Sequence, residues 1–116
     1  MLLSYTLRKP LFDLGEILIS QGVQSAELDV VRYLRRHQGG DFGDVDPEDA
    51  GKNVRAIHSG EAVVSQYQVA HDDRTLELII VTEADRSFTL AMIAGEPMPN
   101  TPGDSGENGG QNPDRA

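Results

Sequence analysis

The spacing of the hydrophobic residues changes once along this chain, close to Gly60, and that change limits the folds open to it. Before Gly60 the apolar residues recur every three or four positions, the period of a helix that packs one face on a core. After Gly60 they alternate with polar residues, the period of a strand with one buried face. Helices followed by strands are typical of an α+β fold, in which helices pack on an antiparallel sheet.

Three short strands are predicted in the second half of the chain. They cover residues 62–69, 76–82 and 88–93. Turn residues at 71–74 and 83–86 join them, and such short connections favour a three-stranded antiparallel meander. Leu76, Leu78 and Ile80 would share one face of the middle strand, which we expect the helices to cover.

Two or three short helices are predicted in the first half. They cover residues 11–22, 25–38 and 46–59. Ser25 is expected to cap the second, and the pair Asp46-Pro47 is a strong start for the third. Gly15 weakens the first, because residues 14–19 also suit a short strand.

The two ends of the chain differ from its middle. From Gly95 to Ala116, nine of 22 residues are Gly or Pro, so we expect a disordered acidic tail. A single domain is then predicted over residues 1–94. Its opening segment, residues 2–8, suits either an edge strand or an extended arm.

Composition excludes several functions. The chain has no Cys, which rules out disulfides and thiolate metal sites, and no apolar run long enough for a membrane helix. No secretory signal is visible at the start, so a cytoplasmic location is expected. The net charge of −9 disfavours direct binding to nucleic acid or anionic lipid. It serves solubility, or it attracts a partner protein with a basic surface.

Two segments do not look like ordinary connectors: the Gly/Asp-rich loop at 37–46 and the charged hairpin at 82–87. Around the loop five carboxylates fall within nine residues, and these are Asp41, Asp44, Asp46, Glu48 and Asp49. Oxygen ligands of this kind suit Ca²⁺ or Mg²⁺, but the spacing does not fit a calcium-binding EF-hand loop. We therefore predict no metal and no cofactor.

Three interpretations of these segments stay open. The first is a binding surface, whose residues would be Asp41, Phe42, Asp44, Glu83, Asp85 and Arg86. The second is a small hydrolase with a divalent ion, whose catalytic residues would be His37, Asp41, Asp44, Glu83, Asp85 and Arg86. The third is purely structural: Phe42 packs on the sheet, Asp41 or Asp44 accepts backbone N–H bonds, and Arg86 pairs locally or crosses to Asp41 or Asp44.

A family resemblance rests on the same segments. The matching residues are His37, Gly40-Asp41-Phe42-Gly43-Asp44, Glu48-Asp49, Asn53 and Val81-Thr82-Glu83-Ala84-Asp85-Arg86-Ser87. In this combination the chain resembles a family of small proteins from bacterial plasmids, phages and integrated elements, known as plasmid-related proteins. It departs from them in Phe42, where Trp is usual. The resemblance implies a mobile-element accessory protein and carries no activity.

The leading hypothesis is therefore a non-enzymatic interaction protein of a mobile element. An inhibitor that blocks a host defence protein through an acidic surface is one form this function would take. A sheet of three strands leaves edges, so the strand at 62–69 could also pair with a second copy or with the opening segment.

Overall fold

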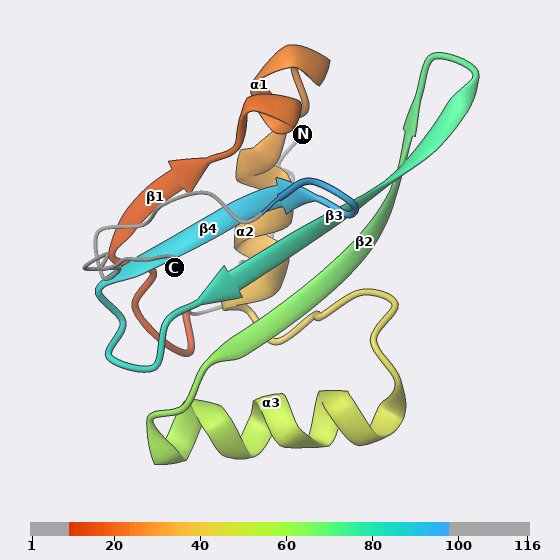
Figure 1. Cartoon of the computed structure of the whole chain (residues 1–116). Coiled ribbons are helices and arrows are strands. Elements are labelled where there is room, and N and C mark those ends of the chain that lie inside the picture. Colours follow the sequence, from red (N-terminus) through yellow and green to blue (C-terminus); the bar gives the residue numbers. More distant parts are fainter. Residues whose placement is uncertain (1–9, 98–116) are drawn as a thin grey trace, which may run out of the picture.

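The structure, a computed structural model, describes residues 10–97 and contains three helices and four strands in that range. The elements are β1 (Glu16–Ile19), α1 (Gln21–Ala26), α2 (Val30–Gln38), α3 (Pro47–Ser59), β2 (Val63–His71), β3 (Arg74–Thr82) and β4 (Phe88–Ile93). The strands form one mixed sheet in the order β1-β4-β3-β2 (Figure 1). The α+β class predicted from the sequence is confirmed.

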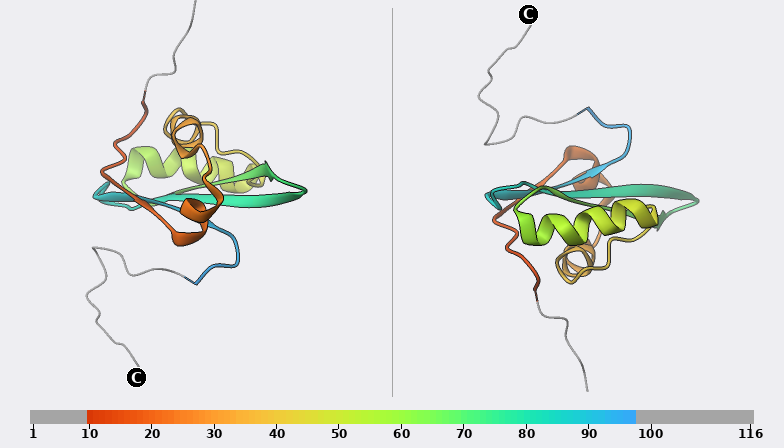
Figure 2. Two further views of the ribbon diagram at one scale, coloured as in Figure 1. Left: turned by 90° about the horizontal axis from the view of Figure 1, so that it is seen from above. Right: turned by 90° about the horizontal axis from the view of Figure 1, so that it is seen from below.

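The helices are arranged unevenly around the sheet. Helices α2 and α3 lie on one side of it, and α1 lies beyond the end of β1 (Figure 2). On the opposite face no helix of the described range covers the strands. No helix within residues 10–97 is long and apolar enough to cross a membrane.

The main core lies between α2 and the sheet. Its buried side chains are Val23, Val30, Leu34, Tyr67, Val69, Leu78, Ile80 and Ala91. Leu78 and Ile80 are fully buried, which confirms the predicted helix-covered face of β3. A second, smaller cluster of Phe12, Phe42, Ala56 and Val63 joins α3 to the start of β2.

The sheet has one more strand than expected. The meander β2-β3-β4 is present, but β1 adds to β4 in parallel, so the prediction of a three-stranded sheet was wrong. The helix predicted over residues 11–22 was also wrong, and the alternative strand within 14–19 is what forms. Gly15, at φ 66°, brings β1 against the turn before β4, where a Cβ would lie 2.4 Å from the Arg86 carbonyl oxygen. The approach of a distant segment thus decides between helix and strand here.

The helix predicted over residues 25–38 is broken in two. Ser20, rather than Ser25, caps α1: its Oγ accepts the Val23 N–H at 3.2 Å. Glu27, in the left-handed conformation at φ 54°, ends α1, and α2 begins after Asp29. The third helix begins after Asp46 and ends at Gly60, as predicted.

Glu96 extends the ordered structure past the predicted domain end at residue 94. Its carboxylate accepts hydrogen bonds from Ser20 Oγ at 2.7 Å, Gly22 N–H at 2.8 Å and Ile93 N–H at 2.7 Å. Partial burial alone would raise the pKa of Glu96, but these hydrogen bonds outweigh it and lower the pKa below its usual value. The rest of the predicted tail, residues 98–116, and the opening segment 2–8 lie outside the described residues.

We expect Glu96→Ala to lower the free energy of unfolding by about 1–2 kcal/mol, because three donors lose their acceptor in a partly exposed site. Urea denaturation measures the loss, and hydrogen exchange at the Gly22 and Ile93 amides should quicken. Glu16→Ala, at an exposed position of β1, is the matched control and should change stability by less than about 0.5 kcal/mol. An equal decrease in the free energy of unfolding of the two variants would contradict the stabilising role of the three hydrogen bonds to the Glu96 carboxylate.

Candidate functional site

His37 lies at the centre of a buried chain of hydrogen bonds. Thr89 Oγ1 donates its one proton to the Leu14 carbonyl oxygen at 2.7 Å, so Thr82 Oγ1 must donate to Thr89 Oγ1 at 2.7 Å. The proton of Thr82 is then used, and His37 Nε2–H donates to Thr82 Oγ1 at 2.8 Å. The other ring nitrogen, Nδ1, accepts from Ser65 Oγ at 2.6 Å. The chain therefore fixes His37 as the neutral Nε2–H tautomer.

The surroundings of His37 keep its imidazole neutral. The side chain is fully buried, and Phe12 packs edge-on against the ring with centroids 5.2 Å apart. Burial and, to a smaller extent, the positive charge of Arg86 together lower the pKa of His37 to about 4. Both ring nitrogens are engaged, so His37 joins α2 to the sheet and presents no free nitrogen to a substrate or metal.

The unfolded chain binds a proton at His37 below about pH 6.5, whereas the folded protein does so only near pH 4. The contribution of His37 to the free energy of unfolding should therefore be fully present above pH 6.5 and decrease as the pH falls toward 4. Between pH 7 and pH 5 we expect the free energy of unfolding to fall by about 2 kcal/mol. Urea titrations at the two pH values measure the difference.

The control for this pH dependence is His37→Gln, which should be less stable at pH 7 but lose less on acidification. If the variant does not fold, the ¹³C shifts of the His37 ring in the native protein supply the test. Titration of that ring near pH 6.5 would contradict the buried neutral tautomer.

The Gly/Asp loop is held by its own residues and by α2. Asp41 forms an ion pair with Arg36, with Nε and Oδ2 2.8 Å apart, and its Oδ1 accepts the Gly43 N–H at 3.2 Å. The Tyr67 hydroxyl donates to the Asp41 carbonyl oxygen, and the Arg36 guanidinium lies over the Tyr67 ring, 4.6 Å from its centroid. The structural interpretation of Asp41 as an acceptor of backbone N–H is thus confirmed.

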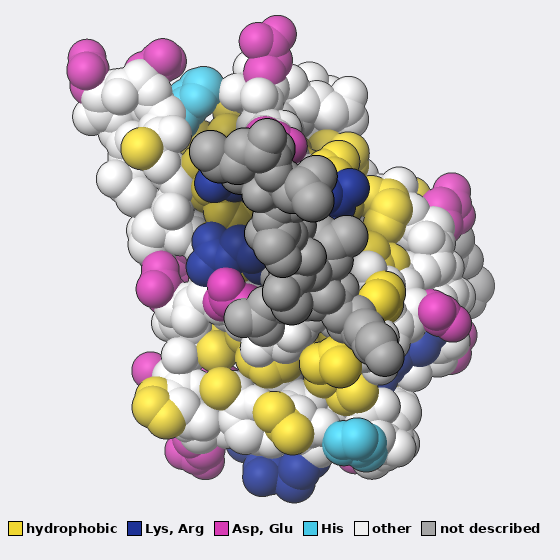
Figure 3. Space-filling view, turned by 180° about the vertical axis from the view of Figure 1, so that it is seen from behind, with side chains coloured by type: hydrophobic (Ala, Val, Ile, Leu, Met, Phe, Trp, Pro, Cys, Tyr) yellow, Lys and Arg dark blue, Asp and Glu magenta, His cyan; other side chains and the backbone are white. Residues whose placement is uncertain are grey.

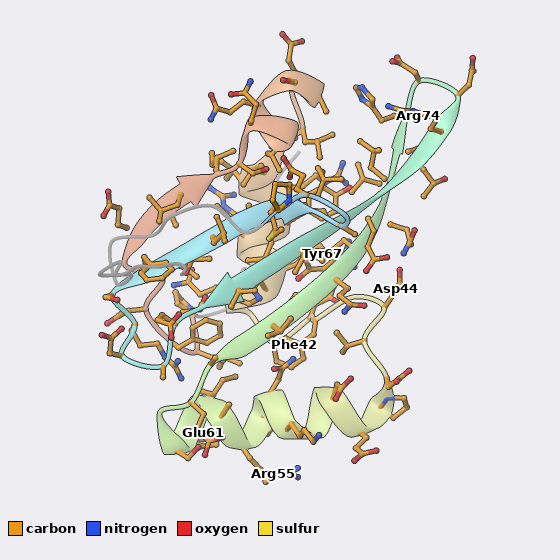
Figure 4. All side chains as sticks on the ribbon, in the orientation of Figure 1. Phe42, Asp44, Arg55, Glu61, Tyr67 and Arg74 are labelled. Atoms are coloured by element: carbon orange, nitrogen blue, oxygen red, sulfur yellow. The ribbon has the colours of Figure 1, made fainter. Side chains whose placement is uncertain are left out.

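The same loop pairs with the outer edge of β2. Gln66 N–H donates to the Phe42 carbonyl oxygen at 3.0 Å, and Asp44 N–H donates to the Gln66 carbonyl oxygen at 2.7 Å. The Phe42 ring is buried, as the structural interpretation expected, and lies between β2 and α3 (Figure 4). Of the proposed binding residues in this loop, Asp44 is the one with an exposed side chain.

Gly43 is required by this close pairing, and Gly60 supplies a matched control. Both have φ > 0, at 73° and 80°, but a Cβ on Gly43 would lie 2.0 Å from the Gln66 carbonyl oxygen, whereas nothing lies within 4 Å of one on Gly60. We expect Gly60→Ala to cost about 1 kcal/mol and Gly43→Ala about 3 kcal/mol or more, because backbone must move. Chemical denaturation of both variants measures this, and equal losses would contradict the pairing.

Arg86 binds main-chain oxygens rather than a carboxylate. Its guanidinium donates to the Ala56 and Glu61 carbonyl oxygens at 3.0 and 2.7 Å, at the end of α3, and to the Glu83 and Ala84 carbonyl oxygens of its own turn. It also lies over the Phe12 ring at 5.4 Å. Within residues 10–97 no carboxylate pairs with it, so both the local salt bridge with Glu83 or Asp85 and the alternative pair with Asp41 or Asp44 were wrong, whereas the local capping of the turn is confirmed.

The other two acids of this hairpin act locally. Asp85 Oδ1 accepts the Ser87 N–H at 2.9 Å, and hydrogen bonding by the Ser87 side chain, followed by that of its N–H, lowers the pKa of the Asp85 carboxyl. Glu83 is half-buried beside the same turn. Among the described residues no group of three His, Asp or Glu side chains is placed to hold a metal ion. The convergence that the hydrolase alternative requires is therefore not present in this range.

The sequence reasoning missed the hydroxyl partners of His37. Ser65 occupies an inward position of β2 between Val63 and Tyr67, and Thr82 and Thr89 face each other across β3 and β4. A serine on an otherwise apolar face was the available signal that a buried polar partner lies opposite.

Two surfaces remain that could meet a ligand or partner. A groove with a volume of about 690 Å³ runs between α3 and β2. It carries charges of both signs, from Asp49, Lys52, Arg55 and Glu61. Figure 4 shows Arg55 and Glu61 pointing away from the body of the protein. The groove has no net charge and gives no preference for an ionic ligand.

The second surface is the far end of the β2–β3 hairpin, which projects beyond the rest of the sheet (Figure 1). Strand β4 pairs with β3 from Leu78 to Thr82, so the segment Arg74–Leu76 has β2 as its one neighbouring strand among the described residues. The hairpin turn exposes Asp72 and Asp73. In the view from behind the hairpin stands at the upper left, with acidic side chains at its tip (Figure 3).

Comparisons with known proteins add no relative. No protein-family model matches the chain, and no match was found among curated proteins or among solved structures. The resemblance to plasmid-related proteins therefore stays a prediction. Function has to be inferred from the geometry and charge of this chain's own residues.

Proposed function

We propose that this protein is a non-enzymatic interaction protein that binds a partner protein through the partner's basic surface. Residues 10–97 hold sixteen Asp and Glu against seven Lys and Arg, a formal net charge of −9. Two of the seven cations serve the fold, since Arg36 pairs with Asp41 and Arg86 binds carbonyl oxygens. A field of this sign speeds association with a cationic surface and repels polyanions.

The observation that carries the proposal is the position of the acids along β2. Asp72 and Asp73 are exposed at one end of this edge strand. Farther along the same edge the exposed Asp44 is joined to the middle of β2 by its main-chain bond to Gln66, and the acidic start of α3 follows at Asp46 and Glu48. Carboxylates thus stand at the tip and beside the middle of one sheet edge.

The side chains with catalytic potential favour binding over catalysis. His37 is buried with both ring nitrogens engaged, and Arg86 is occupied by main-chain carbonyl oxygens. A partner with a DNA-binding groove presents the basic surface that these carboxylates would match. In the mobile-element setting implied by the resemblance, a host defence protein that binds DNA is the partner we propose.

Neutralising the tip acids should weaken such binding. We expect the double variant Asp72→Asn, Asp73→Asn to retain basic proteins from a bacterial lysate about threefold to tenfold less well than the parent chain at low salt. Asn suits Asp72 because that residue has φ 54°, which Asn tolerates well. Quantitative mass spectrometry of the retained proteins, with and without competing duplex DNA, measures the effect.

The matched control is the double variant Asp13→Asn, Glu16→Gln, which removes the same charge from exposed positions near β1. It should retain those proteins as the parent does, and high salt should release them from all three chains. Retention of no basic protein even at low salt would refute the proposed function.

A further inference from the structure

We propose that the outer edge of β2 at Gln68–Ala70 takes an extended, lysine- or arginine-rich segment of the partner as an added strand. This inference rests on the proposed function and deepens it, because it names the surface and the form of the basic segment. Main-chain hydrogen bonds along a sheet edge give affinity in this mode of recognition, and pockets for alternate side chains give specificity.

The main-chain groups of this edge are open. In the antiparallel pairing of β2 with β3, the N–H and C=O groups of alternate residues point outward, and the bonds of Gln66 to the loop show that the even-numbered residues do so. Gln68 and Ala70 are the next two outward residues, and both are exposed. Within residues 10–97 no partner is present for their outward groups.

The first half of the same edge is closed by dedicated contacts. The Asn53 side chain acts as a substitute strand: Oδ1 accepts the Val64 N–H at 3.0 Å and Nδ2 donates to the Val64 carbonyl oxygen at 2.7 Å. Gln66 is closed by the Phe42–Asp44 loop. Folded proteins protect exposed sheet edges in such ways. An edge that is protected at two positions and open at the next two presents a defined place for a short added strand.

A hollow beside the open edge suits a long basic side chain. Its volume is about 380 Å³, and its lining includes Glu27, Asp29, Arg32 and Tyr33 opposite Val69, Ala70 and His71. Its two carboxylates outnumber its one arginine, Arg32, which lies over the Tyr33 ring 5.7 Å from the centroid, and they offer partners to an incoming cation.

The other face and the two ends of the edge are also acidic. Glu77 is paired with Gln68 across the strands, so its half-buried carboxylate lies on the face opposite the hollow. Asp73 and Asp44 lie toward the two ends. An added strand with cations at alternate positions carries them all on one face, and it therefore meets carboxylates whichever face they occupy.

A second copy of this chain fits the edge less well. If two β2 strands paired antiparallel about Val69, Asp72 of one copy would stand opposite Gln66 of the other, beside Asp44. Like charges would then face each other at both ends of the new pairing. A basic segment relieves this repulsion, and for that reason we assign the edge to a partner.

The test uses the full chain, two synthetic peptides of equal charge and two proline variants. One peptide alternates threonine and lysine and can form a strand; the other alternates proline and lysine and cannot donate the ladder bonds. Ala70→Pro removes an outward donor from the open edge. Thr75→Pro is the matched control, because Thr75 is paired with Ala70 and its own N–H points to the opposite edge.

We expect the threonine–lysine peptide to bind and to slow hydrogen exchange at the Gln68 and Ala70 amides. The proline–lysine peptide should bind the parent chain at least about tenfold more weakly. Ala70→Pro should lower the affinity for the threonine–lysine peptide about tenfold, whereas Thr75→Pro should bind that peptide as the parent chain does. Circular dichroism of each variant checks that it is folded. If Ala70→Pro does not fold, Asp29→Asn takes its place as the test, because it keeps the strand intact, and it should weaken binding of the threonine–lysine peptide severalfold.

Other outcomes overturn the inference in distinguishable ways. Equal, salt-sensitive binding of the two peptides would refute strand addition and leave the proposed function standing. Protection of amides elsewhere, or unchanged binding by Ala70→Pro, would refute the assignment to this edge. Binding of neither peptide would count against both this inference and an acidic recognition surface.

Discussion

The buried hydrogen-bond chain through His37 is the interaction on which the rest of the structure depends. It runs from Ser65 in β2 through His37 in α2 to Thr82 and Thr89 in β3 and β4, and ends at the Leu14 carbonyl oxygen before β1. Every hydroxyl proton in it has one assigned acceptor. Removing any member would leave a buried polar group without a partner, which is costly in a core. The chain therefore specifies how the helix layer sits on the four strands.

A second set of contacts fixes the periphery to this centre. Phe12 packs against the edge of the His37 ring on one side and under the Arg86 guanidinium on the other. Through Arg86 the turn before β4 is bonded to the end of α3, and through Asn53 the same helix protects β2. The residues that looked chemically active in the sequence thus hold the fold, and within residues 10–97 the outward main-chain groups of Gln68 and Ala70 have no partner.

The Gly/Asp loop and the charged hairpin show how far sequence reasoning reached. The buried Phe42 and the acceptor role of Asp41 were predicted from residue type, because an aromatic among glycines and aspartates is typical of a tight packed loop. The partner of Asp41 was not predicted, since Arg36 approaches it from the preceding helix. Nor could the sequence show that Arg86 binds carbonyl oxygens, because those oxygens carry no residue signature.

What the sequence determined by itself is local: the helix after Asp46-Pro47, the three alternating strands, the buried face of β3 and the absence of cysteine chemistry. These follow from periodicity and capping, which act within a few residues. The tertiary structure decided the parallel strand β1, the break between α1 and α2, the state of His37 and the open edge at Gln68–Ala70. Each of these depends on groups far apart in the chain, whose meeting no local pattern encodes.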